Sequence, residues 1–188
     1  MDYHFESDCD RQKRAFQARN RWRTPEPEIW LHIGNDIEDA TADSVIAALQ
    51  ASPNAPVWLG INSNGGSGDA CCRIYSALRA HIGETTAHVT GRALSGAVIA
   101  MFGCDVRSAE AQATIMVHNA NCRIGGYKTA ASLCNDAQWL AQLDDEMMQI
   151  ISHRSRYPHW QLRADMEGEK YLTATEAWTL GILTVSPQ

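Results

Sequence analysis

The chain has 188 residues, of which 45% are apolar, and a formal net charge of −6. This length fits one domain with a sizeable core, and the acidic balance argues against a nucleic-acid-binding protein. No apolar run reaches the roughly eighteen residues of a membrane span, and residues 1–10 lack the features of a secretory signal, so we expect a cytoplasmic protein without a membrane partner. The six cysteines form no C-x-x-C pair, and the sequence predicts no metal site.

Residues 1–28 differ from the rest of the chain. Six basic residues lie between Arg11 and Arg23 with little apolar periodicity, and the segment 24–27 contains two prolines that break any helix. We interpret residues 1–28 as an arm, either a solvated tail or a segment that orders against another subunit, and predict a single domain over residues 29–188.

From Ile29 onward, predicted strands and helices alternate. Alternating apolar residues predict strands at 29–33, 57–62, 85–90, 113–118 and 182–185. Apolar residues at helical spacing, together with a capping box at 173–176, predict helices at about 42–49, 74–82, 95–102, 129–153 and 174–180. Strands separated by helices indicate an α/β domain with a mostly parallel sheet.

Two glycines follow the strand at 57–62 and precede a helix. Gly65 and Gly66 allow the backbone to approach a ligand closely, and their N–H groups could face a developing negative charge. A plain tight turn is the commoner explanation of such a pair.

A serine and a histidine stand at the ends of two further predicted elements. Ser95 opens a short apolar helix, where an N-cap role is the usual explanation of an isolated serine. His118 ends an apolar strand, where most histidines are structural. Together, however, the two residue types could form a nucleophile and its general base.

The strings INSNGG, GRALSG and IMVHN occur in this order, and a tail EKYLTATEA follows them. This set resembles the Clp protease proteolytic subunit family, over about residues 29–185. The resemblance implies the Clp/crotonase superfamily fold, with repeated ββα units and a projecting handle helix at about 119–155. It also implies Ser95 as nucleophile, His118 as base, and the backbone N–H groups of Gly66 and Gly96 as the oxyanion hole.

The family's third catalytic residue is usually Asp, and Glu169 occupies that position here. Asp165 and Glu167 are rivals for the role. The chain also has Asn64 where the family commonly has Pro, and Gly96 where it often has a larger residue.

The resemblance implies a serine endopeptidase that cleaves peptides or unfolded protein chains inside a homo-oligomeric chamber of stacked rings, without a cofactor. An AAA+ unfoldase is the family's usual partner and engages an axial pore formed by the residues before the first strand. Residues 1–28 lack the pattern of that pore. Three alternatives remain open: a phage capsid-maturation type of protease, an inactive ring subunit, and a crotonase-type acyl-CoA enzyme.

Overall fold

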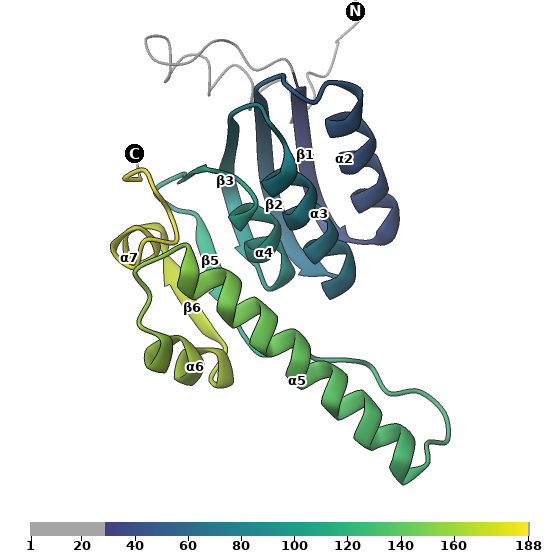
Figure 1. The fold of residues 1–188 in the computed structure, drawn as a ribbon. Helices are drawn as coiled ribbons and strands as arrows, with labels where there is room; N and C mark the ends of the chain where they lie inside the picture. Colours follow the sequence, from purple (N-terminus) through teal and green to yellow (C-terminus); the bar gives the residue numbers. More distant parts are fainter. Residues whose placement is uncertain (1–28, 188) are drawn as a thin grey trace, which may run out of the picture.

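The computed structural model describes residues 29–187, so the predicted arm at 1–28 lies outside the described residues. These residues form one mixed sheet (Figure 1) with strands β1 (Ile29–Ile37), β2 (Val57–Gly66), β3 (Thr85–Leu94), β4 (Val106–Ala109), β5 (Thr114–Val117) and β6 (Lys170–Thr173). Strands β1, β2 and β3 are parallel neighbours, and β6 ends the sheet antiparallel to β5. The prediction of a mostly parallel α/β sheet is confirmed.

Strand β3 is shared by two partners. Its first half pairs in parallel with β4, and its last three residues, Arg92–Leu94, pair in parallel with β5. Because β5 takes over at the end of β3, the segments that follow these two strands lie side by side.

Three helices cover one face of the sheet (Figure 1): α2 (Asp39–Ala51), α3 (Gly68–Ala80) and α4 (Gly96–Phe102). Ser67 is the N-cap of α3, and its hydroxyl accepts a hydrogen bond from the Ala70 N–H at 3.3 Å. All seven residues of α4 are buried, as its apolar sequence predicts. Helices α6 (His159–Glu167) and α7 (Ala174–Thr179) flank β6, and Thr173 and Glu176 form the predicted capping box of α7.

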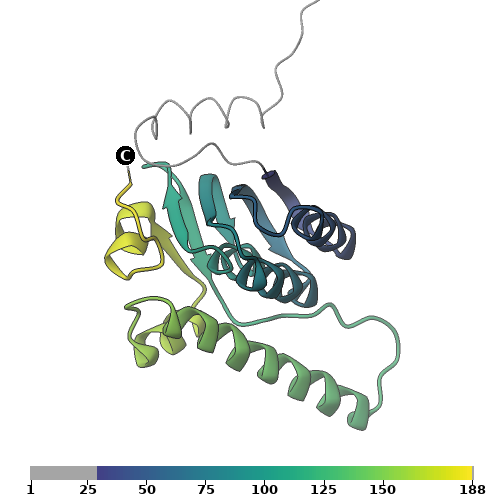
Figure 2. The same ribbon diagram turned by 45° about the horizontal axis from the view of Figure 1, so that its top comes forward.

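Helix α5 (Ala130–His153) projects from the domain (Figures 1 and 2). Its buried residues all lie in its second half, beginning at Leu143. The segment 121–142 contains no buried side chain, so the first half of the helix extends into solvent as the predicted handle does.

The predicted strand at 182–185 is wrong. Ile182 and Leu183 are consecutive and both buried, so their burial does not alternate as in a half-buried strand. Instead, the segment is held by Arg107, a buried residue of β4. The Arg107 side chain donates hydrogen bonds to the carbonyl groups of Ile182 (2.8 Å) and Gly181 (3.4 Å), as well as those of Cys104 and Arg154.

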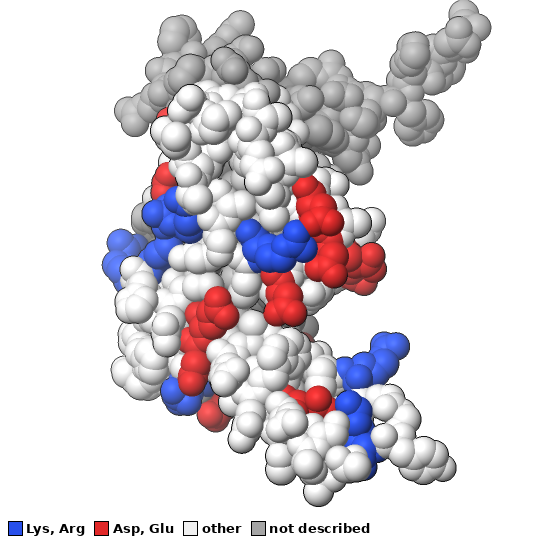
Figure 3. Space-filling model, turned by 45° about the vertical axis from the view of Figure 1, so that its right-hand side comes forward, with Lys and Arg blue, Asp and Glu red and all other residues white. Residues whose placement is uncertain are grey.

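On the face drawn in Figure 3, acidic and basic side chains are interspersed in small groups. This face therefore carries no extended patch of one sign. Among the charged side chains of the covering helices, Arg73 of α3 pairs with both Asp39 and Asp43 of α2. Among residues 29–187, no helix is long and apolar enough to cross a membrane.

Candidate active site

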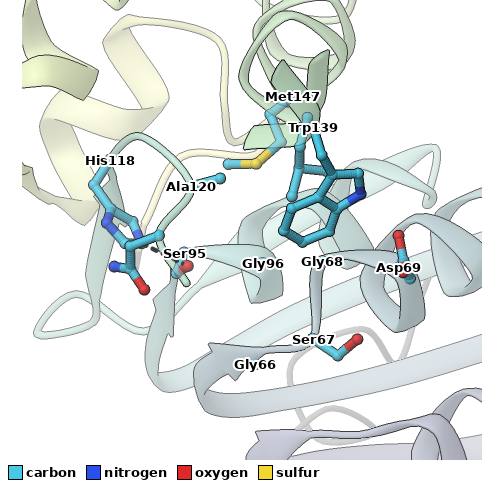
Figure 4. Close-up of a pocket in the computed structure, with 12 residues that line it drawn as sticks. Gly66, Ser67, Gly68, Asp69, Ser95, Gly96, His118, Ala120, Trp139 and Met147 are labelled. Carbon is cyan, nitrogen blue, oxygen red and sulfur yellow. Dashed lines mark hydrogen bonds between the residues drawn. The ribbon is translucent and has the colours of Figure 1, made fainter. Parts of the chain in front are cut away.

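The sheet register brings Ser95 and His118 together. Leu94 of β3 pairs with Met116 of β5, and the Ser95 N–H donates to the Met116 carbonyl oxygen at 2.9 Å. Ser95 directly follows Leu94, and His118 follows Met116 by two positions, so both lie where the paired strands end. His118 Nε2 lies 2.7 Å from Ser95 Oγ (Figure 4). In the neutral tautomer with the proton on Nδ1, the serine hydroxyl donates to Nε2, the contact that a general base needs.

Ser95 has an unusual backbone conformation. Its φ is 56° and its ψ is −129°, a region that favours glycine over residues with a side chain. The conformation makes a sharp turn between β3 and α4, and the Ser95 side chain makes no capping bond to the helix. The hydroxyl therefore faces His118. It does not cap the helix, which is the role that the sequence alone would usually suggest for an isolated serine.

The glycines predicted for the oxyanion hole lie beside this turn. A Cβ placed on Gly65 would stand 2.8 Å from Ser95 Cβ and 3.0 Å from the Gly96 nitrogen. A Cβ placed on Gly96 would stand 3.8 Å from the Gly66 nitrogen. As the first residue of α4, Gly96 has an N–H without an acceptor inside the helix. The two backbones are thus adjacent, next to Ser95.

Gly96 is also explained by packing. A Cβ at this position would stand only 2.4 Å from the sulfur of Cys71, a buried residue of α3. The larger residue that the family often carries does not fit because Cys71 occupies the space. Burial, followed by the neighbouring Cys72, raises the pKa of the Cys71 thiol to about 12, so it stays protonated.

A cavity of about 180 Å³ lies next to Ser95 (Figure 4). Ser95, Gly66, Gly96 and His118 line it on the sheet side. The opposite wall is largely apolar and comes from α5 and the segment before it, with Ala120, Trp139, Leu143 and Met147. An apolar side chain could therefore be bound here with a carbonyl group close to Ser95.

The three candidate acids have different surroundings. The β5–β6 register ends with Val117 paired to Lys170, so His118 and Glu169 each lie one residue beyond this last pair. However, the exposed Glu169 carboxylate accepts a hydrogen bond from the Tyr171 hydroxyl at 2.8 Å. Among residues 29–187, His118 has no hydrogen-bond partner besides Ser95.

The rival acids lie on α6. Asp165 accepts a hydrogen bond from the Tyr157 hydroxyl at 2.6 Å, and Tyr157 is buried. Burial and this bond raise the pKa of Tyr157. Glu167 is exposed at the end of the helix. The position of Glu169, one residue from the last β5–β6 pair, therefore favours it over both.

A second serine–histidine–carboxylate group was missed by the sequence reasoning. His88 of β3 lies with Nδ1 2.9 Å from Ser108 Oγ and Nε2 3.2 Å from Glu110. His88 pairs with Ser108 across the β3–β4 ladder, Glu110 directly follows β4, and Ser108 also donates to the Ala87 carbonyl oxygen. This group does not line the cavity at Ser95, and no glycine pair accompanies it in the sequence.

No cluster of metal-ligating side chains occurs in the part of the chain that the structure describes.

Comparison with known proteins identifies the family. Residues 17–185 match the family model described as Clp protease. The chain belongs to the Clp protease family. Its mixed sheet with covering helices is the Clp/crotonase type of fold that the motifs implied, and the chain is a ClpP-like serine peptidase.

The curated relatives have modest identity over most of their length. The chain is 27% identical over 157 residues to the ATP-dependent Clp protease proteolytic subunit 2 of Streptomyces avermitilis, covering 81% of this chain and 78% of that one. It is 28% identical over 160 residues to the ATP-dependent Clp protease proteolytic subunit of Pelargonium hortorum, covering 82% and 73%. The corresponding subunit 2 of Corynebacterium diphtheriae is 27% identical over 159 residues, covering 81% and 79%.

Proposed function

We propose that the protein is a serine endopeptidase in which Ser95 is the nucleophile, His118 the general base and Glu169 the acid that orients the histidine. The 2.7 Å contact between Ser95 Oγ and His118 Nε2 carries this proposal. His118 and Glu169 each lie one residue beyond the last β5–β6 pair, Val117 and Lys170, and this supports the third role.

In the proposed reaction, Ser95 Oγ attacks the peptide carbonyl carbon while His118 takes the hydroxyl proton. The Gly66 and Gly96 N–H groups stabilise the negative oxygen of the tetrahedral intermediate. His118 then gives the proton to the leaving amine as the C–N bond breaks, which leaves an acyl ester on Ser95. Water, deprotonated by His118, hydrolyses the ester and restores the serine.

The substrates are short peptides or unfolded chains. The apolar wall formed by Trp139, Leu143 and Met147 favours an apolar side chain near the scissile bond. We further propose that α5 joins copies of this chain into stacked rings that enclose the sites. An AAA+ unfoldase would then supply unfolded chains, in line with the ATP-dependent names of the relatives.

The test is hydrolysis of fluorogenic peptides by the assembled protein, combined with labelling by a fluorophosphonate probe. Ser95→Ala should remove labelling and lower kcat by about 10³-fold or more, because the nucleophile is lost. Glu169→Gln should lower kcat by up to about 10⁴-fold while leaving the assembly intact.

Ser108→Ala is the matched control, since Ser108 also contacts a histidine but does not line the cavity. It should retain labelling and turnover. A wild-type protein that is neither labelled nor active in any oligomeric state would favour an inactive ring subunit, whereas full turnover in Glu169→Gln would remove Glu169 from the mechanism.

A further inference from the structure

Tyr171 is hydrogen-bonded to the Glu169 carboxylate, which in the proposed mechanism should bind His118. The Tyr171 hydroxyl donates to Glu169 Oε1 at 2.8 Å, and this bond raises the pKa of Tyr171. Among residues 29–187, the Nδ1 side of the His118 ring has no hydrogen-bond partner. The His118 Nδ1–H, which should donate to the Glu169 carboxylate, is therefore not bonded to it in this conformation.

Tyr171, the observed partner of the Glu169 carboxylate, and His118, its proposed partner, line different hollows of the surface. Tyr171 lines an open hollow of about 420 Å³ together with Asn62, Arg92 and Thr114. His118 lines the cavity next to Ser95, and the two hollows share no lining residue. Glu169 lines neither hollow, so its carboxylate, bonded to Tyr171, does not contribute to the substrate cavity.

Glu169 lies just outside strand β6, and its carboxylate has room to move from Tyr171 to His118. Its φ is 55°, in the left-handed region, so the residue departs from the regular strand that begins at Lys170. A glutamate also has one more rotatable bond than the aspartate usual in the family. Because the side chain is exposed, it can rotate without disturbing the core.

We propose that Tyr171 is a positioning residue that competes with His118 for the Glu169 carboxylate. The inference rests on the proposed function, in which Glu169 is the acid of the triad. In this conformation the carboxylate accepts a bond from Tyr171 and none from His118, so the side chain must move before it can accept the His118 Nδ1–H. Tyr171 therefore lowers the fraction of sites that carry a complete triad.

The test is peptide hydrolysis by the assembled Tyr171→Phe variant. One hydrogen bond of this kind has a modest net free energy, so its loss should raise kcat by about two- to tenfold. KM should not change, because Tyr171 does not line the substrate cavity. In a Glu169→Gln background the same substitution should have no effect.

Tyr157→Phe is the matched control, because it removes a hydroxyl bonded to a rival acid, Asp165. It should leave kcat unchanged. Unchanged or lowered kcat in Tyr171→Phe would overturn the competition. That outcome differs from failure of the proposed function, which is instead seen as undiminished turnover in Glu169→Gln with Tyr171 in place.

The hydrogen bond can also be followed without activity. In protein with ¹³Cζ-labelled tyrosine, the Tyr171 signal should titrate at higher pH in the wild type than in Glu169→Gln, because the carboxylate disfavours the phenolate. The signal is assigned by its absence in Tyr171→Phe. Identical midpoints in the two proteins would overturn the proposal.

Discussion

At the scale of single residues, Ser95 shows how a reactive group is obtained at some expense in stability. Its φ of 56° is one that side chains disfavour, by about 1–3 kcal/mol. The same turn directs the hydroxyl to His118 and exposes the Gly96 N–H beside it. The conformation is therefore retained for geometry and not for stability.

We expect Ser95→Gly to be more stable than Ser95→Ala, because glycine accepts the positive φ without strain. The difference should be about 1–3 kcal/mol, or about 2–4 °C in Tm per kcal/mol for a domain of this size, measured by thermal unfolding. Both variants lack the nucleophile and should be inactive. At Ser108, in the regular strand β4, the order should reverse, with Ala above Gly. Equal melting temperatures at position 95 would contradict the strain.

At the scale of elements, the sequence predicted most strands and helices but missed β4, β6 and α6. Alternation identified β1, β2, β3 and β5, and helical spacing identified α5. Strands β4 and β6 have four residues each and few strongly apolar side chains, whereas the equally short β5 contains the apolar run Ile115–Val117. The Ser95–His118 pair followed from motifs and their order. The bond between Glu169 and Tyr171 could not, because rotamers and a positive φ leave no pattern in a single sequence.

The contact between α3 and α4 gives a prediction at this scale. Gly96→Ala should destabilise the protein by about 1–3 kcal/mol, since its Cβ would stand 2.4 Å from Cys71 Sγ. Cys71→Ala removes that sulfur, so the double variant should recover part of the loss. Urea unfolding of the four proteins measures the coupling. Additive losses would mean that the two side chains do not share this space.

At the scale of the whole molecule, the projecting half of α5 and the loop before it leave apolar side chains in solvent. Ile124 is 55% exposed and Tyr127 is fully exposed. Such side chains suit a surface that is covered when copies associate. The proposed rings would cover them.

We expect light scattering after size exclusion to give the mass of a multimer for the wild type. Ile124→Asp combined with Tyr127→Asp should lower that mass by placing charges in the proposed contact. Ile82→Asp, at a 76% exposed isoleucine after α3, is the control and should leave the mass unchanged. A wild-type monomer at all concentrations would contradict the chamber.

Arg107 has a consequence for how the chain is made. Its guanidinium group is buried, which lowers its pKa to about 10, and its hydrogen bonds go to backbone carbonyl groups as far along the chain as Ile182. A cation buried without those acceptors would cost several kcal/mol. During synthesis, β4 therefore cannot settle into its final place until Gly181 and Ile182 have left the ribosome. Folding of this domain should be completed in one late and cooperative step.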